Sequence, residues 1–276
     1  MYNKTVFLDM GLYEICIVAA IVVALMLADK MGIKRGFSVR LQKLVIFGAM
    51  GGVVIGFFGA VLFQAFYNYM DTGVFKITKT TGMTFYGGLL FGAAGYLAVW
   101  FGVGKRYCKD NEQVKQFSAI ADIAAALLPL AHGLGRLGCL FAGCCHGNAT
   151  DAWYGITMDT PDAGHGKFVP VQLFEALALF ALAGVILWLY FKPKKAEFPL
   201  LPIYMIGYGI WRFVIEYARG DHRGETIVPF LSPSQLIAVV LILGGVAYYI
   251  VWRNIKKNAK KKECVEYEQD GSNASV

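Results

Sequence analysis

The chain has 276 residues, of which 57% are hydrophobic and 16% charged, and its mean hydropathy is +0.52. Because soluble domains average about 25% charged residues, this composition excludes an ordinary soluble protein. The formal net charge of +7 would suit a nucleic-acid-binding protein, but the placement of the basic residues gives them another role.

Seven long segments are almost free of charge, and a stretch of about 20 apolar residues crosses the hydrocarbon core of a bilayer. In lipid the backbone must satisfy its own hydrogen bonds, which helices do. We therefore predict an all-α membrane protein with seven transmembrane helices. They cover residues 11–28, 44–66, 85–103, 118–134, 171–191, 198–215 and 232–252. The first segment lacks a basic start and a cleavage site, so it is predicted to be a retained helix rather than a signal peptide.

Most of the 26 lysines and arginines lie on one side of this seven-helix arrangement. They fill the connections 29–43 and 104–117, the connection after residue 191, and the C-terminal tail. An excess of lysine and arginine marks the cytoplasmic side of a membrane protein. We therefore expect the N-terminus outside, the C-terminus in the cytoplasm and no nucleic-acid partner.

One domain is expected. Residues 1–255 form a single polytopic membrane domain, and residues 256–276 form a basic, disordered cytoplasmic tail. The longest connection is an outer-side loop region near 136–170. Glycines recur at three- and four-residue spacing in the second span, at Gly48, Gly52, Gly56 and Gly59, and small residues at that spacing allow close helix packing.

Two spans carry charged residues at or near membrane depth. His132 and Arg136 are four residues apart in the fourth span, so they share a helix face. In the sixth span Arg212 and Glu216 are four apart, and Arg219 follows Glu216 by three. An Arg–Glu–Arg ladder keeps one net positive charge, which suits a phosphate group, because the planar guanidinium binds phosphate oxygens with two hydrogen bonds. The alternative is a self-satisfied salt bridge at the interface.

The stretch GRLGCLFAGCCHG at 135–147 allows three interpretations of its cysteines. Cys139, Cys144 and Cys145 could simply pack or act as thiols, which we rank first. Cys139 could form a disulfide with Cys144 or Cys145, since this loop is expected outside the cytoplasm. A metal site ranks third, because structural zinc usually has a second pair of ligands. No metal ion and no cofactor are predicted.

Five motifs then resemble, in order, the prolipoprotein diacylglyceryl transferases of the bacterial plasma membrane. The chain has MTFYGGL at 83–89 and GRLG at 135–138 with a closing Gly147. It continues with WYG at 153–155 followed by VPVQLFE at 169–175, then GIWRFVIEYAR at 209–219 and LSPSQ at 231–235. Seven spans with the N-terminus outside agree with this family.

The resemblance implies a multi-pass enzyme of the bacterial inner membrane with its active site toward the outer face. Such an enzyme moves diacylglyceryl from phosphatidylglycerol to the lipobox cysteine of a preprolipoprotein and releases glycerol phosphate. The candidate site residues fall into a catalytic set and a substrate-binding set. The catalytic set is Arg136, Arg212, Glu216, Tyr86 and His146; the substrate-binding set is Arg219, Gly135, Cys139, Cys144, Gly147, Gln172, Glu175, His132 and Tyr13.

The chain also departs from the family's pattern. Tyr86 stands where the family has histidine, Cys139 where it has asparagine, and Cys144 where it has glutamate. Val169 and Phe174 replace a histidine and a tyrosine. Tyrosine, with a pKa near 10, is a poor base at neutral pH, so His132 or His146 is expected to replace the missing base.

Three functions therefore remain open at the level of sequence. The first is the family's transferase reaction. The second is a divergent enzyme that acts on phosphatidylglycerol or another anionic phospholipid with a different acceptor or reaction. The third is a non-enzymatic protein that binds lipid or uses the cysteines for redox or metal chemistry.

Overall fold

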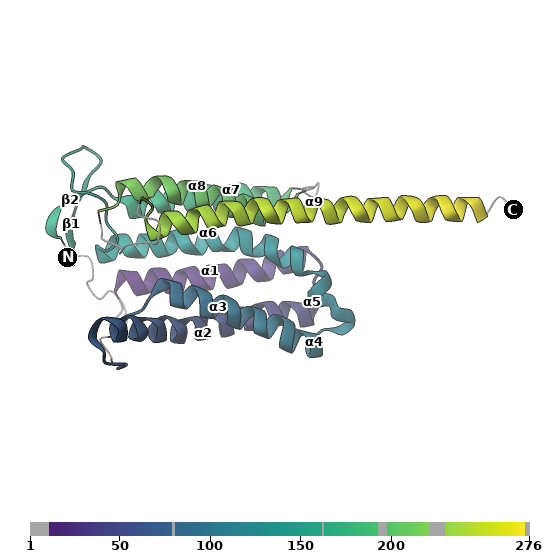
Figure 1. The fold of residues 1–276 in the computed structure, drawn as a ribbon, viewed down its shortest axis with the longest axis horizontal. Coiled ribbons are helices and arrows are strands. Elements are labelled where there is room, and N and C mark those ends of the chain that lie inside the picture. The colour runs from purple at the N-terminus through teal and green to yellow at the C-terminus, as the bar shows by residue number, and fades with distance from the viewer. Residues whose placement is uncertain (1–10, 79–80, 162, 193–197, 221–229, 274–276) are drawn as a thin grey trace. The chain divides into compact units, whose positions relative to one another are not determined.

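The computed structural model describes residues 11–78, 81–161, 163–192, 198–220 and 230–273, without the side chains of Asp71, Phe85, Tyr86 and residues 259–273. Within these ranges the chain is mostly helical, with one two-stranded sheet (Figure 1). The chain forms two compact units, and each is described by itself. The first comprises Met1–Ala24 and Ala124–Val276, and the second comprises Leu25–Ile123.

The second unit is built around two long helices, α2 (Val39–Thr72) and α3 (Phe85–Ala98). Ser38 caps α2, since its hydroxyl accepts a hydrogen bond from the Leu41 amide at 3.1 Å. The C-terminal part of α1 (Leu12–Lys34) and the start of α6 (Phe117–Ala142) belong to the same unit. Short helical segments connect α3 to α6, namely η1 (Val99–Val103), α4 (Gly104–Tyr107), η2 (Lys109–Asn111) and α5 (Glu112–Lys115).

Glycines set the distance between α2 and α3. A methyl group on Gly56 would lie 2.8 Å from the Gly88 carbonyl oxygen, and one on Gly87 would lie 2.7 Å from the Gly59 carbonyl oxygen. A methyl group on Gly52 would likewise lie 3.2 Å from the Gly92 carbonyl oxygen. The prediction that the glycines of the second span serve packing is therefore confirmed at these positions.

The first unit contains the rest of α1 and α6, together with α7 (Val171–Phe191), α8 (Leu201–Ile215), η3 (Glu216–Ala218) and α9 (Pro233–Asn273). Helices α6 to α9 run lengthwise beside one another (Figure 1). Gly133 of α6 packs on Phe180 of α7, and Gly209 of α8 packs on Ile242 of α9. These contacts pack α6 against α7 and α8 against α9, the helices from which the site is built.

A β-hairpin lies in the connection between α6 and α7. Strand β1 (Ile156–Thr160) pairs antiparallel with β2 (Gly164–Phe168), with Ile156 opposite Phe168 and Thr160 opposite Gly164. The sequence predicts a loop region near 136–170. The structure instead continues α6 to Ala142 and forms the hairpin within the remainder.

Six helices are long and apolar enough to cross a membrane by length and composition, counted over the described part of the chain. They are Leu12–Lys34, Val39–Met70, Gly87–Tyr107, Phe117–Ala142, Val171–Phe191 and Pro233–Asn258. The remaining predicted span, 198–215, is the sixth in chain order and corresponds to α8, whose 15 residues reach only about 22 Å. That length falls short of the roughly 30 Å hydrocarbon core, so the number of spans and the orientation stay predictions.

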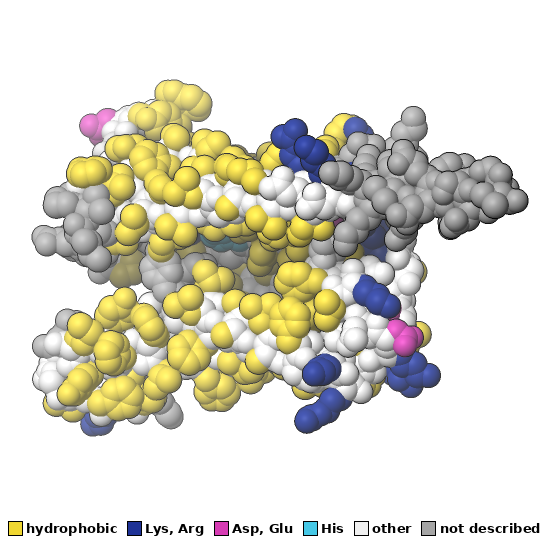
Figure 2. All heavy atoms as spheres, turned by 45° about the vertical axis from the view of Figure 1, so that its right-hand side comes forward, with side chains coloured by type: hydrophobic (Ala, Val, Ile, Leu, Met, Phe, Trp, Pro, Cys, Tyr) yellow, Lys and Arg dark blue, Asp and Glu magenta, His cyan; other side chains and the backbone are white. Residues whose placement is uncertain are grey.

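Hydrophobic side chains cover the visible helix faces of each unit (Figure 2). Large exposed residues such as Phe58 and Leu243 are 66% and 63% accessible, which is the pattern of lipid-facing helices. Helix α9 continues to Asn273, into the range 256–276 where the sequence predicts a disordered tail. The single-domain assignment also stays a prediction.

Candidate active site

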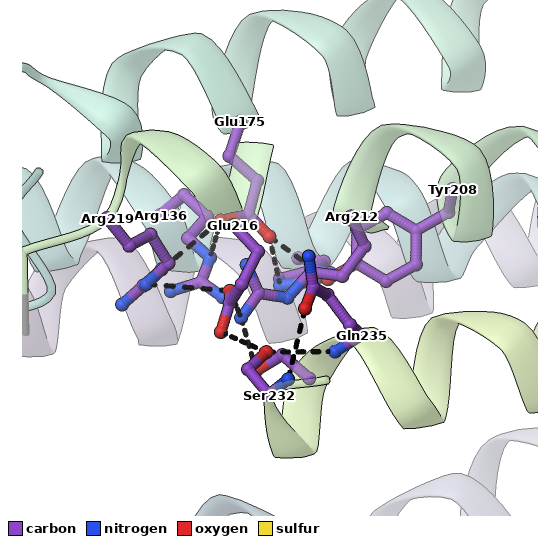
Figure 3. A network of polar contacts seen from close by, with 10 residues as sticks. Arg136, Glu175, Tyr208, Arg212, Glu216, Arg219, Ser232 and Gln235 are labelled. Atoms are coloured by element: carbon purple, nitrogen blue, oxygen red, sulfur yellow. Dashed lines mark hydrogen bonds and ion pairs between the residues drawn. The ribbon is translucent and has the colours of Figure 1, made fainter. Parts of the chain in front are cut away.

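Glu175 is the centre of a buried polar cluster in the first unit (Figure 3). It lies in the second turn of α7 and is 0% exposed. Arg136 Nε of α6 lies 3.0 Å from its Oε2 atom, and Arg219 Nη1 lies 3.9 Å from the same atom. Its Oε1 atom accepts a hydrogen bond from the Tyr208 hydroxyl at 3.0 Å and lies 3.9 Å from His132 Nε2. Side chains from the three helices α6, α7 and α8, together with Arg219 directly after η3, therefore meet at one carboxylate.

Glu216 forms the second negative charge of the cluster. Its Oε2 atom lies 2.7 Å from Arg212 Nη2 and 3.9 Å from Arg219 Nε, and Ser232 donates a hydrogen bond to its Oε1 atom at 2.8 Å. Arg212 Nη2 also donates to the Ser234 hydroxyl at 2.6 Å. The i,i+4 and i,i+3 pairs expected from the sequence are both present. Arg219 is thus shared between the two carboxylates (Figure 3).

A capping box at the start of α9 places the serines. The Ser232 hydroxyl accepts from the Gln235 amide at 3.1 Å, and the Gln235 side-chain oxygen accepts from the Ser232 amide at 3.0 Å. This reciprocal pair is the signature of a helix N-terminus, and Pro233 at the first helical position fits it. The opening of the last helix at LSPSQ is therefore confirmed. The positive end of the α9 dipole faces the cluster.

The charges of the cluster do not cancel. Arg136, Arg212 and Arg219 carry three positive charges, and Glu175 and Glu216 carry two negative ones, so one positive charge remains. Arg212 Nη1 is buried and makes no hydrogen bond to the described residues. Because buried donors are normally satisfied, this nitrogen is suited to bind an oxygen of an anionic ligand.

The three cysteines of the 135–147 stretch meet at the C-terminal end of α6. Gly143 has φ +69 and its amide donates to the Leu140 oxygen at 3.2 Å, while the Cys144 amide donates to the Cys139 oxygen at 3.2 Å. These two bonds form a Schellman motif, which folds Cys144 back over Cys139. The sulfur atoms of Cys139, Cys144 and Cys145 all lie within 4.8 Å of one another.

None of the five described cysteines is in a disulfide, Cys139, Cys144 and Cys145 included. Hydrogen bonds from the Cys139 and Cys144 thiols, together with the nearby guanidinium groups of Arg136 and Arg219, lower the pKa of the Cys145 thiol. Tyr13 of α1 lies within electrostatic range of all three thiols.

The chain after the cysteines is fixed by backbone pairing. The Gly147 amide donates to the Val169 oxygen at 2.9 Å, and the Asn148 amide donates to the Ala218 oxygen at 3.0 Å. A methyl group on Gly147 would lie 2.6 Å from the Ala218 oxygen, so only glycine fits between the segments that carry Val169 and Ala218. Gln172 of α7 is 0% exposed and donates to the Cys144 oxygen at 2.8 Å. The thiol cluster is thereby tied to α7 and to the segment that carries Arg219.

The other predicted site residues take different positions. His146 is 3% exposed, its Nδ1 atom lies 2.8 Å from the Gly147 oxygen and its ring packs on Phe168. Gly135 lies on α6 beside Arg136, and a methyl group added to it would lie 3.9 Å from Ile17 Cδ1. The side chain of Tyr86 lies outside the described residues.

Sequence reasoning missed Tyr208, Ser232 and Ser234 as members of the cluster. For Tyr208 a signal existed, since Tyr208, Arg212 and Glu216 follow one another at four-residue spacing and so share a helix face. For the two serines, the capping pattern S-P-S-Q marks the helix start but gives no indication of what the hydroxyls contact.

Comparison with known proteins agrees with the predicted resemblance. The family profile described as "Prolipoprotein diacylglyceryl transferase" matches residues 4–251. The phosphatidylglycerol–prolipoprotein diacylglyceryl transferase 2 of Clostridium perfringens (strain 13 / Type A) is 31% identical over 257 residues, which are 92% of this chain and 94% of the relative. The corresponding proteins of Clostridium tetani (strain Massachusetts / E88) and Pseudomonas entomophila (strain L48) are 30% and 32% identical over 87% and 80% of this chain, and 92% and 80% of their own lengths. The chain belongs to the prolipoprotein diacylglyceryl transferase family.

Proposed function

We propose that this chain is an integral-membrane transferase that moves diacylglyceryl from phosphatidylglycerol to the cysteine thiol of a prolipoprotein. The observation that carries this proposal is the buried cluster of three arginines and two carboxylates with one net positive charge. Family membership and the names of the relatives support it. The reaction joins sulfur to the glyceryl carbon and breaks the bond from that carbon to the phosphate oxygen, so glycerol phosphate leaves.

The cluster suits the charge that develops on that leaving group. Arg212 has a buried Nη1 donor without a partner among the described residues, and its Nη2 atom is fixed by Glu216 and Ser234. Arg136 and Arg219 are held by Glu175. Donors that are already oriented stabilise developing negative charge without reorganising during the reaction. Glu175 and Glu216 thus act as positioning residues for the phosphate-binding arginines.

The finer features of the proposal concern the membrane. We place the protein in the bacterial inner membrane with seven spans, α8 and η3 forming the sixth. The N-terminus and the active site lie toward the outer face. The donor is phosphatidylglycerol, and the acceptor is the lipobox peptide of a preprolipoprotein. The basic residues of the predicted cytoplasmic connections support this orientation.

Purified protein in detergent, supplied with labelled phosphatidylglycerol and a lipobox peptide, tests the proposal. We expect the peptide to gain the mass of diacylglyceryl and glycerol phosphate to appear in equal amount. Arg212→Ala should lower kcat by about 100- to 1000-fold, as loss of one oxyanion donor does. The exposed Arg106 of α4 provides a control, and Arg106→Ala should keep full activity. Transfer at the unchanged rate by Arg212→Ala would contradict the phosphate-binding assignment.

A second candidate function is favoured by one observation. Cys139 and Cys144, which form the thiol cluster, stand where the resembled family has asparagine and glutamate. A divergent enzyme would cleave the anionic phospholipid but use another acceptor. Release of glycerol phosphate from phosphatidylglycerol in the absence of peptide, with no peptide product when it is present, would select this alternative.

A further inference from the structure

The three thiols at the end of α6 have the spacing of metal ligands. Their sulfur atoms lie within 4.8 Å of one another. Three sulfurs bound to one zinc ion at about 2.3 Å would be about 3.8 Å apart. Rotation of the side chains alone can supply a shift of that size. The same sulfurs belong to separate thiols in the structure, since Cys139, Cys144 and Cys145 are not in disulfides.

The backbone holds this arrangement in place. The Schellman motif around Gly143 brings Cys144 over Cys139, although four residues separate them. Cys145 then adopts φ +60, a left-handed conformation that is uncommon for cysteine and is found at functional sites. Gln172 secures the Cys144 carbonyl, and the Gly220 amide donates to the His146 oxygen at 3.3 Å. In metal sites, hydrogen bonds from residues that do not bind the metal typically hold the ligands in position in this way.

The charges around the cluster also suit a metal thiolate. Three thiolates with a divalent cation carry one net negative charge. Arg136 and Arg219 lie within electrostatic range of Cys145. Within the described part of the chain, no histidine, aspartate or glutamate joins the three sulfurs to form a larger group. Three protein ligands and one open position are the arrangement of catalytic zinc sites.

We propose that Cys139, Cys144 and Cys145 bind one zinc ion through three thiolates, and that the fourth position takes the acceptor thiol. The second part rests on the proposed transferase function. The acceptor thiol releases its proton to water when it binds, because a coordinating thiol is deprotonated by the metal. Its sulfur then forms the bond to the glyceryl carbon while the carbon–oxygen bond breaks. The electron pair of that bond leaves on glycerol phosphate, beside the arginines.

This proposal accounts for the departures from the family's pattern. Tyr86 replaces a histidine, and tyrosine is a poor base at neutral pH. A zinc-bound thiol needs no strong base, since the metal itself favours the thiolate. The cysteines that replace the family's asparagine and glutamate are then the metal ligands. The product is a thioether, a weak ligand, which leaves the metal and completes the reaction.

Metal analysis of the full-length protein, purified under reducing conditions and dialysed after addition of zinc, tests the site without any activity assay. We expect one zinc per chain in the wild type. Cys144→Ser removes a direct ligand and should weaken zinc binding by more than the roughly 100-fold that loss of an outer-shell partner can cost. Cys16→Ser, a change outside the cluster, should keep one zinc per chain. Equal zinc content in Cys144→Ser and wild type would overturn the assignment.

X-ray absorption on the wild type keeps the test independent of whether variants fold. We expect three sulfur neighbours at about 2.3 Å from zinc, and a fourth when a lipobox peptide is added. A peptide with serine in place of the cysteine should leave three. Absence of bound zinc, or a disulfide among the three cysteines in the reduced protein, would overturn the metal site. If zinc still has three sulfur neighbours after the lipobox peptide is added, the proposed binding of the acceptor thiol at the fourth position is wrong.

The outcomes also separate this proposal from the transferase function. If the protein binds zinc through three sulfurs but transfers no diacylglyceryl, the metal site is supported and the proposed transferase function is contradicted. If the protein transfers diacylglyceryl at full rate without zinc, the transferase function is supported and the role of zinc is contradicted.

Discussion

Glu175 shows how a single buried carboxylate organises the site. It is 0% exposed and faces Arg136, Arg219, His132 and Tyr208. A carboxylate in such a place is stable only because the cations beside it compensate the loss of water. Its main effect is therefore on geometry, since it fixes where two guanidinium groups of the proposed phosphate site point.

Glu175→Gln tests this organising role. The change keeps the size of the side chain but removes the charge that compensates Arg136 and Arg219. Because breaking a buried ion pair typically costs 3–5 kcal/mol, we expect a loss of about that size in the free energy of unfolding. Glu14→Gln, at an exposed position of α1, should change it by less than about 0.5 kcal/mol. Denaturation in detergent measures both, and equal stability of the two variants would contradict the role.

At the residue scale the sequence predicts part of the site directly. The ladder of Arg212, Glu216 and Arg219 follows from helical spacing, and the structure confirms both ion pairs. Glu175 comes from another helix, so no local spacing could place it there, and only the family resemblance pointed to it. The meeting of Cys139 with Cys144 depends on the left-handed conformation of Gly143, which the pattern of cysteines does not reveal.

The end of helix α6 is an element whose geometry rests on one glycine. Gly143 has φ +69, and a methyl group there would lie 2.1 Å from the Asp159 oxygen of β1. Gly164 has φ +71 but nothing within 4 Å of the added methyl group. These two positions separate the cost of the backbone conformation from the cost of the clash.

We expect Gly164→Ala to destabilise the protein by about 1–2 kcal/mol, which is the cost of the left-handed conformation alone. Gly143→Ala should cost more, since the carbonyl of Asp159 must also move, and it should disturb the thiol cluster. Thermal unfolding and the reactivity of the cysteines toward an alkylating agent measure the two effects. Equal stability of both variants would show that the hairpin moves away without cost.

Ser232 links the start of α9 to Glu216. Ser232→Ala removes the helix cap, which costs about 0.5–2 kcal/mol, and also removes a hydrogen bond to Glu216. Ser38→Ala removes a comparable cap from α2 outside the proposed site. We expect similar losses of stability in the two variants, but lower transferase activity only in Ser232→Ala. Equal transferase activity of the two variants would show that the hydrogen bond from Ser232 to Glu216 does not contribute to the reaction.

Element boundaries were predicted less well than element positions. Each predicted span corresponds to a helix, yet α2 continues to Thr72 rather than ending at residue 66. Hydropathy marks the apolar part of a helix, whereas its end is set by Gly73, which adopts φ +72 and donates to the Tyr69 oxygen. The hairpin at 156–168 was missed, because its short strands contain glycine and charged residues that read as a loop.

For the whole molecule, the number of spans decides on which sides the termini lie. An odd number puts them on opposite sides, and an even number puts them on the same side. Helix α8 is the segment in question, and its 15 residues are extended by the three of η3. At 1.5 Å per residue these reach about 27 Å, close to the thickness of a bilayer core.

We therefore expect seven spans, with the N-terminus outside and the C-terminus in the cytoplasm. Reporters that are active on only one side of the membrane, fused in turn to each end of the chain, measure this. The C-terminal fusion should be active with a cytoplasmic reporter and the N-terminal one with an external reporter. Activity of the same reporter at both ends would mean that α8 does not cross.

The glycine contact between α2 and α3 also bears on how the second unit forms. Glycine has no rotamers to lose, so this interface carries none of the side-chain entropy cost of ordering leucine or methionine. Methyl groups added to Gly56 and Gly92 would lie 2.8 and 3.1 Å from the carbonyl oxygens of Gly88 and Gly52, so the two helix backbones approach closely. Helices α2 and α3 can therefore pair as soon as both are in the bilayer, without waiting for any ligand or charged partner.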